Sequence, residues 1–220
     1  MNNTFTIIGS TGLIGSELLK LLLNDESVHI IRPLNRRSVV LENDKIQQKI
    51  IDFQDEAAFR EAIAGSKAVF VCVGTTSKKV KGDQNAYRKV DYDIPVKAAQ
   101  YCSETKVEKL LIVSSIGASS KSRNFYTKLK GEMEEAVAGF ELPSTVFFRP
   151  SMLLGARQEF RLGEAIGKAL MKPLSVLLPE NYKAVQAAFV AKAMLLAAKS
   201  KMSGHQVLHL KEMRQLAESQ

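Results

Sequence analysis

The chain has 220 residues, of which 45% are hydrophobic and 25% charged, and its formal net charge is +8. This length predicts one α/β domain, and the apolar share is enough for a substantial core. The longest apolar runs are shorter than the roughly 20 residues of a membrane helix, so we expect no membrane partner. The Lys and Arg residues are spread over the whole chain, which favours a solvated basic surface over nucleic-acid binding.

The cysteines and the first residues bear on the compartment. Cys72 and Cys102 are the two cysteines and lack the spacing of a metal site, so we expect two reduced thiols. The chain enters its first predicted strand almost at once, which leaves no room for a signal peptide. Together these features predict a cytoplasmic protein.

The first predicted unit is a strand over 5–8, a glycine turn and a helix over 16–23. Such a strand, turn and helix form the phosphate-binding corner of dinucleotide folds, because the first N–H groups of the helix attract an anion. The spacing G-x-x-G-x-x-G is one residue longer in its first gap than the usual fingerprint. An ordinary glycine-rich turn is the alternative. We predict that the cofactor contacts Gly9, Ser10, Thr11, Gly12, Leu13, Ile14 and Gly15.

The second predicted strand, 28–35, ends in Arg36 and Arg37. Proteins selective for NAD place an acidic residue near this point, about 20 residues after the last glycine, whereas a nearby Arg accommodates the 2′-phosphate of NADP. Here the next acid is Glu42. Two guanidinium groups can hold that phosphate and stack on adenine. The sequence therefore predicts NADP(H) over NAD(H), with an exposed basic turn as the alternative.

The third and fourth predicted strands cover 46–51 and 68–73. Asp52 and Phe53 follow the third strand, where the Asp either meets the adenine edge or begins the next helix. The fourth strand is apolar throughout, as buried parallel strands are. It ends in Gly74, Thr75 and Thr76, at the carboxyl edge where such sheets bind ligands. We therefore add these five residues to the predicted cofactor site.

The remaining pattern continues the alternation of strands and helices. We predict helices over 55–64, 86–105 (with a start or kink at Pro95), 126–138, 159–171 and 186–199, strands over 109–113, 144–148 and 205–210, and a polar C-terminal helix. Repeated βα units predict a Rossmann-like, doubly wound parallel sheet with helices on both faces. We expect one domain over 1–220, with a cofactor-binding core over 1–150 and a small lid and C-terminal part over 151–220.

Three residues form a predicted catalytic set. Tyr126 and Lys130 are four residues apart on a predicted helix and so share one face, and Ser115 ends the fifth strand. An ammonium near a phenol favours the phenolate, and a Ser hydroxyl can hold a carbonyl or alcohol oxygen. Alone, Y-x-x-x-K occurs on many exposed helices. After a strand ending in Ser and a dinucleotide corner, it predicts proton transfer alongside hydride transfer.

These stretches together resemble the atypical short-chain dehydrogenase/reductase superfamily, in the NADP-binding, oxidoreductase-like group around the HIV Tat-interacting protein. The resemblance spans most of the chain, through 9–15, 35–37, 51–53, 73–76, 114–115, 126 with 130–132, 148–150, 157–159 and 163–164. It implies an NADP(H) site lined by these stretches, a Ser115-Tyr126-Lys130 set, and backbone after Pro150 close to the nicotinamide amide.

The chain departs from that pattern at two points. The gap between Ser115 and Tyr126 is shorter than in standard enzymes of the superfamily. The Asn of their proton relay has no matched position, because Asn85 precedes the helix that would carry it. Atypical members often keep the nucleotide and lose the chemistry.

Two function classes remain open at this point. The first is an NADP-dependent oxidoreductase acting on a small carbonyl or alcohol substrate. The second is an NADP(H)-sensing regulatory protein with little turnover, which would act through a protein partner or a homodimer. We expect no metal site, since His29, His205 and His209 lie far in sequence from the catalytic set. Met152, Leu153, Leu154 and Phe160 either line an apolar substrate pocket or form the core of the lid.

Overall fold

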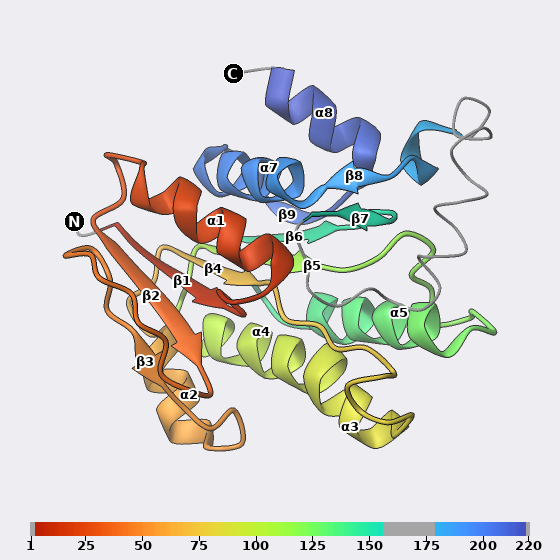
Figure 1. Cartoon of the computed structure of the whole chain (residues 1–220), viewed down its shortest axis with the longest axis horizontal. Helices are drawn as coiled ribbons and strands as arrows, with labels where there is room; N and C mark the ends of the chain where they lie inside the picture. Colours follow the sequence, from red (N-terminus) through yellow and green to blue (C-terminus); the bar gives the residue numbers. More distant parts are fainter. Residues whose placement is uncertain (1–2, 156–178, 219–220) are drawn as a thin grey trace.

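The computed structural model describes residues 3–155 and 179–218. Its middle layer is a seven-stranded sheet in the order β3-β2-β1-β4-β5-β6-β9, and every pairing is parallel (Figure 1). From β1 the chain steps outward to β2 and β3, and it then returns to β4 and steps outward on the other side. This doubly wound topology confirms the predicted Rossmann-like fold and places its switch point between β1 and β4.

The strands of this sheet agree with the predicted runs most closely at β5 and β6. They are β1 Thr4–Ile8, β2 Ile30–Asn35, β3 Lys49–Ile50, β4 Ala68–Val71, β5 Lys109–Val113, β6 Ser144–Phe148 and β9 Gly204–Leu208. β5 and β6 have the predicted bounds, whereas β2 begins two residues later and β4 ends two residues earlier. The third strand is reduced to two paired residues and an isolated bridge between Ile31 and Ile46. Its side chains are exposed at the sheet edge, so little apolar burial extends it.

Helices cover both faces of the sheet. One face carries α1 Leu13–Leu23, α7 Ala187–Lys199 and α8 Leu210–Glu218, and the other carries α2 Glu56–Ile63, α4 Ile94–Glu104 and α5 Phe125–Ala138 (Figure 1). Of the described helices, none is both long and apolar enough to cross a membrane.

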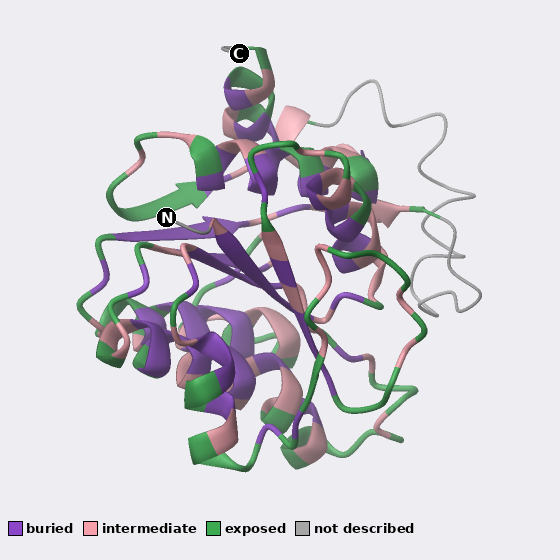
Figure 2. Cartoon of the chain, turned by 90° about the vertical axis from the view of Figure 1, so that its left-hand side faces the viewer, coloured by how far each residue is buried: buried purple, intermediate pink, exposed green. Residues whose placement is uncertain are grey.

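The core consists of two hydrophobic clusters, one on each face of the sheet. Side chains alternate along a strand, so Ile7 joins the cluster beneath α1 and α7 while Ile8 joins the one beneath α2 and α4. Figure 2 shows the buried strands between the two helical layers. Each fully buried Ile, Leu or Phe side chain stabilises the fold by about 1.5–3 kcal/mol. The two clusters therefore hold the strand ends, and the loops after them, in fixed positions.

The helix predicted over 86–105 is divided into three parts. α3 spans Gln84–Arg88, a π-helical turn η1 spans Lys89–Asp93, and α4 begins at Ile94 with Pro95 in its first turn. Proline is tolerated there because the first N–H groups of a helix lack an intrahelical partner. Pro95 therefore lies where the π turn gives way to α4, inside a helical run that continues from Gln84 to Glu104. The π turn was not predicted.

The C-terminal part adds elements to the same sheet and covers its carboxyl edge. β9 pairs with β6, and α7 packs beside α1. A separate small sheet joins β7 Leu153–Leu154 to β8 Val185–Gln186, which follows the short 3-10 helix η2 Glu180–Tyr182. Neither short strand was predicted. The helix predicted over 159–171 and the side chain of Phe160 lie outside the described residues.

Candidate active site

The turn between β1 and α1 has the backbone of a phosphate-binding corner. Gly9 has φ +91°, and its carbonyl accepts a hydrogen bond of 3.0 Å from the N–H of Gly12. Gly12 is the N-cap of α1 and makes no side-chain cap, which leaves the first N–H groups of the helix to bind a ligand. At Gly15, a Cβ would lie 2.1 Å from the carbonyl oxygen of Gly9, so the close packing of α1 on the turn requires glycine.

A cavity of about 750 Å³ opens at this corner. Its wall includes the turn itself, the ends of β2 and β4, Gly155 and the first residues of α7. It thus lies outside the carboxyl ends of the strands at the switch point, the usual ligand position in an open α/β sheet. Among the predicted cofactor residues, its wall contains Gly9, Thr11, Gly12, Leu13, Arg36, Phe53, Gly74 and Thr75.

The other predicted cofactor residues lie close to this cavity without forming its wall. Ser10 is buried in the turn, and Gly15 supports the turn from within α1. Arg37 is exposed next to Arg36. Asp52 accepts a hydrogen bond from the N–H of Gln54, whereas the N-cap of α2 is Asp55. Thr76 accepts a bond from the N–H of Lys79 and so shapes the following loop.

The wall of the larger cavity also includes polar residues that are not among the predicted cofactor residues, and Asn35 and Lys79 are two of them. Asn35 ends β2, about 20 residues after Gly15, where NAD-selective proteins carry an acid. Its Oδ1 accepts a hydrogen bond from Ser10 Oγ (3.0 Å), and its buried Nδ2 has no hydrogen-bond partner among the described residues. The position of Asn35, at the end of the predicted strand 28–35, was visible in the sequence. The prediction of the cofactor used only Arg36 and Arg37, which follow it.

A second cavity of about 60 Å³ brings the predicted catalytic set together. Ser115, Tyr126 and Lys130 all line it, and so do Ile14 at the start of α1 and Pro150 after β6. It shares Gly74 and other wall residues with the larger cavity, so the two lie side by side. The Ser-Tyr-Lys set therefore lies next to the dinucleotide corner.

Lys130 is engaged in a buried ion pair that the sequence did not predict. Its Nζ lies 3.0 Å from Asp91 Oδ1, and each of the two side chains is 2% exposed. The other carboxylate oxygen of Asp91 accepts a 2.8 Å hydrogen bond from the N–H of Thr75. Asp91 lies in the π turn η1 and also lines the small cavity. An acid in the helix predicted over 86–105 was the available signal, since a buried lysine needs a partner.

The aromatic side chain of Tyr87 supports the same region from α3. Its ring packs edge-on against Tyr126, with centroids 6.1 Å apart and an interplanar angle of 65°, and against Phe125 at 5.6 Å and 89°. Its hydroxyl donates a 3.0 Å hydrogen bond to the carbonyl of Thr75. Edge-to-face pairs of this kind stabilise by about 0.5–1.5 kcal/mol beyond the area they bury.

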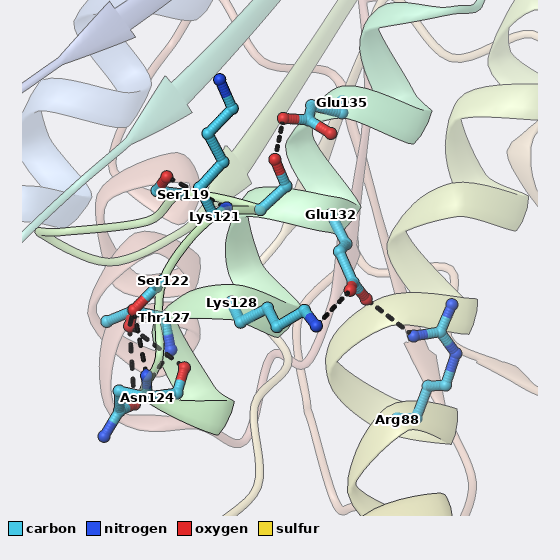
Figure 3. Close-up of polar contacts among 10 residues, drawn as sticks. Arg88, Ser119, Lys121, Ser122, Asn124, Thr127, Lys128, Glu132 and Glu135 are labelled. Atoms are coloured by element: carbon cyan, nitrogen blue, oxygen red, sulfur yellow. Dashed lines mark hydrogen bonds and ion pairs between the residues drawn. The ribbon is translucent and has the colours of Figure 1, made fainter.

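The loop before α5 fixes the start of the helix that carries Tyr126 and Lys130 (Figure 3). Asn124 is the N-cap, and its Oδ1 accepts hydrogen bonds from the N–H groups of Tyr126 and Thr127. Ser122 and Thr127 share a 2.6 Å hydrogen bond between their hydroxyls. The loop also crosses α5 at Gly131, where a Cβ would lie 2.1 Å from the backbone carbon of Ser119. Tyr126 therefore begins a helix whose first turn is held in place.

Behind the small cavity, Glu134 joins the ends of two strands to α5. It binds Arg149 through two hydrogen bonds, of 3.0 Å to Nε and 2.5 Å to Nη2, and it accepts one from Ser114 Oγ. Its side chain is 8% exposed. Because Ser114 directly precedes Ser115, this pair fixes the backbone that carries the predicted catalytic serine.

The two thiols are poor candidates for a nucleophile. Burial raises the pKa of the Cys72 thiol, on the wall of both cavities, to about 12, and it raises the pKa of Cys102 further. Both thiols stay protonated at neutral pH and are poor nucleophiles. Over residues 3–155 and 179–218, no cluster of His, Cys, Asp or Glu side chains could hold a metal ion.

Comparison with known proteins agrees with this geometry. Residues 9–154 match the family model described as NAD(P)H-binding. The mitochondrial protein FMP52 of Debaryomyces hansenii is 36% identical over 157 residues, covering 70% of this chain and 68% of that protein. Protein HTATIP2 of Rattus norvegicus is 30% identical over 197 residues, covering 88% of this chain and 80% of that protein.

Solved structures show the same fold at low identity. A UDP-N-acetylglucosamine 4-epimerase from Methanobrevibacter ruminantium aligns with a TM-score of 0.71 at 18% identity, over 99% of this chain and 81% of that one. The Bordetella bronchiseptica enzyme WbmH, solved in complex with NAD⁺, has a TM-score of 0.71 at 16% identity, over 95% of this chain and 75% of that one.

One expectation is wrong by these comparisons. The relatives from Debaryomyces hansenii, Meyerozyma guilliermondii and Candida albicans are named as mitochondrial proteins, which contradicts the predicted cytoplasmic location. The family itself is shown. The chain belongs to the NAD(P)H-binding family, in the atypical short-chain dehydrogenase/reductase group with FMP52 and HTATIP2, and its cofactor is a nicotinamide dinucleotide.

Proposed function

We propose that this protein is an NADP(H)-dependent oxidoreductase that interconverts a small carbonyl compound and its alcohol. The observation that carries the proposal is the small cavity, in which Ser115, Tyr126 and Lys130 meet beside the dinucleotide cavity. When bound, the cofactor supplies or accepts a hydride at its nicotinamide ring.

The residues of the larger cavity fit a phosphorylated dinucleotide. The uncapped start of α1 offers N–H groups to the pyrophosphate, and Gly12 leaves room for it. Arg36 and Lys79 bring positive charge to the wall, and the described wall near Asn35 holds no acid to repel a 2′-phosphate. These features support NADP(H) over NAD(H). Glu17, the one acid on the described part of the wall, belongs to α1.

The side chains of the small cavity divide the proton chemistry among them. In the reducing direction, Tyr126 donates its phenolic proton to the carbonyl oxygen of the substrate, and the hydroxyl of Ser115 holds that oxygen by a hydrogen bond. Lys130 places a positive charge beside the phenolate that forms. Pro150 and Leu153 give the cavity an apolar side. In the oxidising direction, the proton returns from the alcohol to Tyr126.

Replacing Tyr126 tests the assignment. Tyr126→Phe keeps the ring against Tyr87 and removes the proton, so turnover should fall by about 10²- to 10⁴-fold with NADPH affinity nearly unchanged. A panel of small carbonyl compounds, followed by NADPH absorbance, measures this. Tyr182→Phe at an exposed tyrosine is the matched control and should match the parent. Equal turnover by Tyr126→Phe and the parent would refute the catalytic role.

A second function is favoured by the ion pair between Lys130 and Asp91. Because a carboxylate 3.0 Å away already balances the ammonium, less positive charge is left to stabilise a phenolate. This favours an NADP(H)-sensing protein with little turnover. Its signature is the absence of turnover across the panel, together with a proteolysis pattern that changes between NADPH and NADP⁺. A pattern that is the same with both nucleotides would contradict the sensor.

A further inference from the structure

Both backbone polar groups of Thr75 are held by side chains from one helical segment. The N–H of Thr75 donates to Asp91 Oδ2 at 2.8 Å, and its carbonyl accepts from the Tyr87 hydroxyl at 3.0 Å. Tyr87 and Asp91 belong to α3 and to the π turn that continues it. Thr75 is itself 7% exposed and lines the dinucleotide cavity. Two hydrogen bonds thus join the helical segment 84–93 to the loop after β4, which lines the dinucleotide cavity.

The same two side chains also contact α5, the helix that carries Tyr126 and Lys130. Asp91 Oδ1 lies 3.0 Å from Lys130 Nζ, and the ring of Tyr87 packs edge-on against that of Tyr126. Each therefore contacts a different member of the predicted set. Lysine has a long flexible side chain, and a buried ammonium without a carboxylate is strongly unfavourable, so Asp91 restricts where Lys130 can lie.

The π turn contributes to this arrangement. Its i→i+5 pattern is rare and occurs frequently at functional sites, often as a single wide turn within a helix. Here it spans Lys89–Asp93, and Asp91 is its buried residue. A chain that continued as a regular α-helix from α3 would direct position 91 differently, since each residue advances by a different angle in the two helices.

We propose that Asp91 and Tyr87 are positioning residues, which set the geometry of Lys130 and Tyr126 and connect it through Thr75 to the cofactor site. The inference rests on the proposed role of Lys130 and Tyr126. Asp91 acts through Lys130 and through the N–H of Thr75, and Tyr87 acts through Tyr126 and through the carbonyl of Thr75. Neither is a proton donor in the reaction.

A double-mutant cycle tests the role of Asp91. NADPH dissociation constants, from the fluorescence of the bound nucleotide, are compared for the parent, Asp91→Asn, Lys130→Met and the double variant, with kcat and KM where turnover exists. Asp91→Asn should lower affinity or kcat by about 10- to 100-fold, the range expected for a lost contact to a charged group. The double variant should lose less than the sum of the two single losses, because part of the effect of Asp91 passes through Lys130. Fully additive losses would overturn the proposal. An Asp91→Asn variant with the same NADPH affinity and kcat as the parent would also overturn it.

Glu56→Gln is the matched control for this cycle. Glu56 forms an ion pair with Lys97 that links α2 to α4, and its side chain is 65% exposed, unlike the buried pair between α5 and the π turn. Loss of that exposed pair should change neither affinity nor turnover. A parent that binds NADPH without reducing any carbonyl would refute the proposed function, while the cycle on affinity would still decide the role of Asp91.

Tyr87 is tested by a graded pair of variants, which also covers the case in which Asp91→Asn does not fold. Tyr87→Phe removes one hydroxyl and should weaken NADPH binding by about 2- to 10-fold, with kcat nearly retained. Tyr87→Leu also removes the ring against Tyr126 and should lower kcat further, with little additional change in affinity. Equal kcat for the two variants would contradict the positioning of Tyr126.

Discussion

Alanine at two glycines of the phosphate corner should have different effects. Gly12→Ala should weaken nucleotide binding, whereas Gly15→Ala should destabilise the fold. At Gly12, the added Cβ would lie 3.2 Å from the carbonyl oxygen of Gly9 and 3.5 Å from that of Cys72, so a shift of a few tenths of an ångström accommodates it. At Gly15, the Cβ would lie 2.1 Å from the oxygen of Gly9 and 2.9 Å from its carbonyl carbon. Real contacts of this kind are essentially never under 3.0 Å, so α1 or the turn must move.

The expected magnitudes follow from this difference. Gly12→Ala should keep its melting temperature within about 2 °C of the parent, because little rearrangement is needed. The methyl group occupies space on the cavity wall, so NADPH affinity should fall by about 10- to 100-fold. Gly15→Ala should destabilise the fold by about 1–3 kcal/mol, as overpacking typically does. For a domain of this length that lowers the melting temperature by about 2–12 °C.

Thermal unfolding by circular dichroism and nucleotide titration by calorimetry measure the two effects separately. Gly139→Ala is the control, because Gly139 ends α5 with helical angles (φ −74°, ψ −11°), and its Cβ would have 3.3 Å to the nearest carbonyl oxygen. It should leave both quantities unchanged. The reasoning would be refuted if Gly12→Ala bound NADPH as tightly as the parent, or if Gly15→Ala melted at the parental temperature.

Two further predictions concern the wall of the same cavity. Asn35→Asp should lower the ratio of NADPH to NADH affinity by about 10-fold or more, because a carboxylate there repels a 2′-phosphate and accepts hydrogen bonds from the ribose hydroxyls. Calorimetry with both nucleotides measures the ratio. An unchanged ratio would contradict the NADP assignment. Cys72 has its pKa raised to about 12 by burial, so its thiolate forms only near and above that pH. At pH 8 it should react with a thiol reagent at least about 100-fold more slowly than the same cysteine in the unfolded chain, as followed by mass spectrometry; equal rates would refute the burial argument.

The fold could be predicted from the sequence wherever local pattern and tertiary burial agree. β5 and β6 have the predicted bounds because each is an apolar run buried in the middle of a parallel sheet. β3 lies at the edge, where two exposed residues pair and burial does not specify where the strand begins or ends. The π turn at Lys89–Asp93 has no sequence signature of its own, so a continuous helix was the natural prediction.

The candidate site has two halves, the cofactor corner and the group of side chains around the small cavity. The sequence predicts the first more directly than the second. The cofactor corner is encoded within a short stretch from Gly9 to Gly15, where backbone geometry requires particular residues, and the sequence shows them directly. Asp91 and Lys130 come from separate helices and meet only because those helices pack on the same face of the sheet. Tyr87 and Thr75 are likewise joined through tertiary structure. No spacing rule finds such partners.

An enzyme and a sensor place different demands on the two halves of the candidate site. The cofactor half depends on glycines and on the start of α1, so a chain can keep nucleotide binding while its side chains change. The half around the small cavity depends on side chains from α3, the π turn, α5 and the loop after β5, which must keep their relative positions. Thr75 belongs to both halves, since it lines the cofactor cavity and is held by Asp91 and Tyr87. A nucleotide that moves Thr75 therefore also acts on Lys130 and Tyr126, which would serve a hydride-transfer enzyme and an NADP(H) sensor alike.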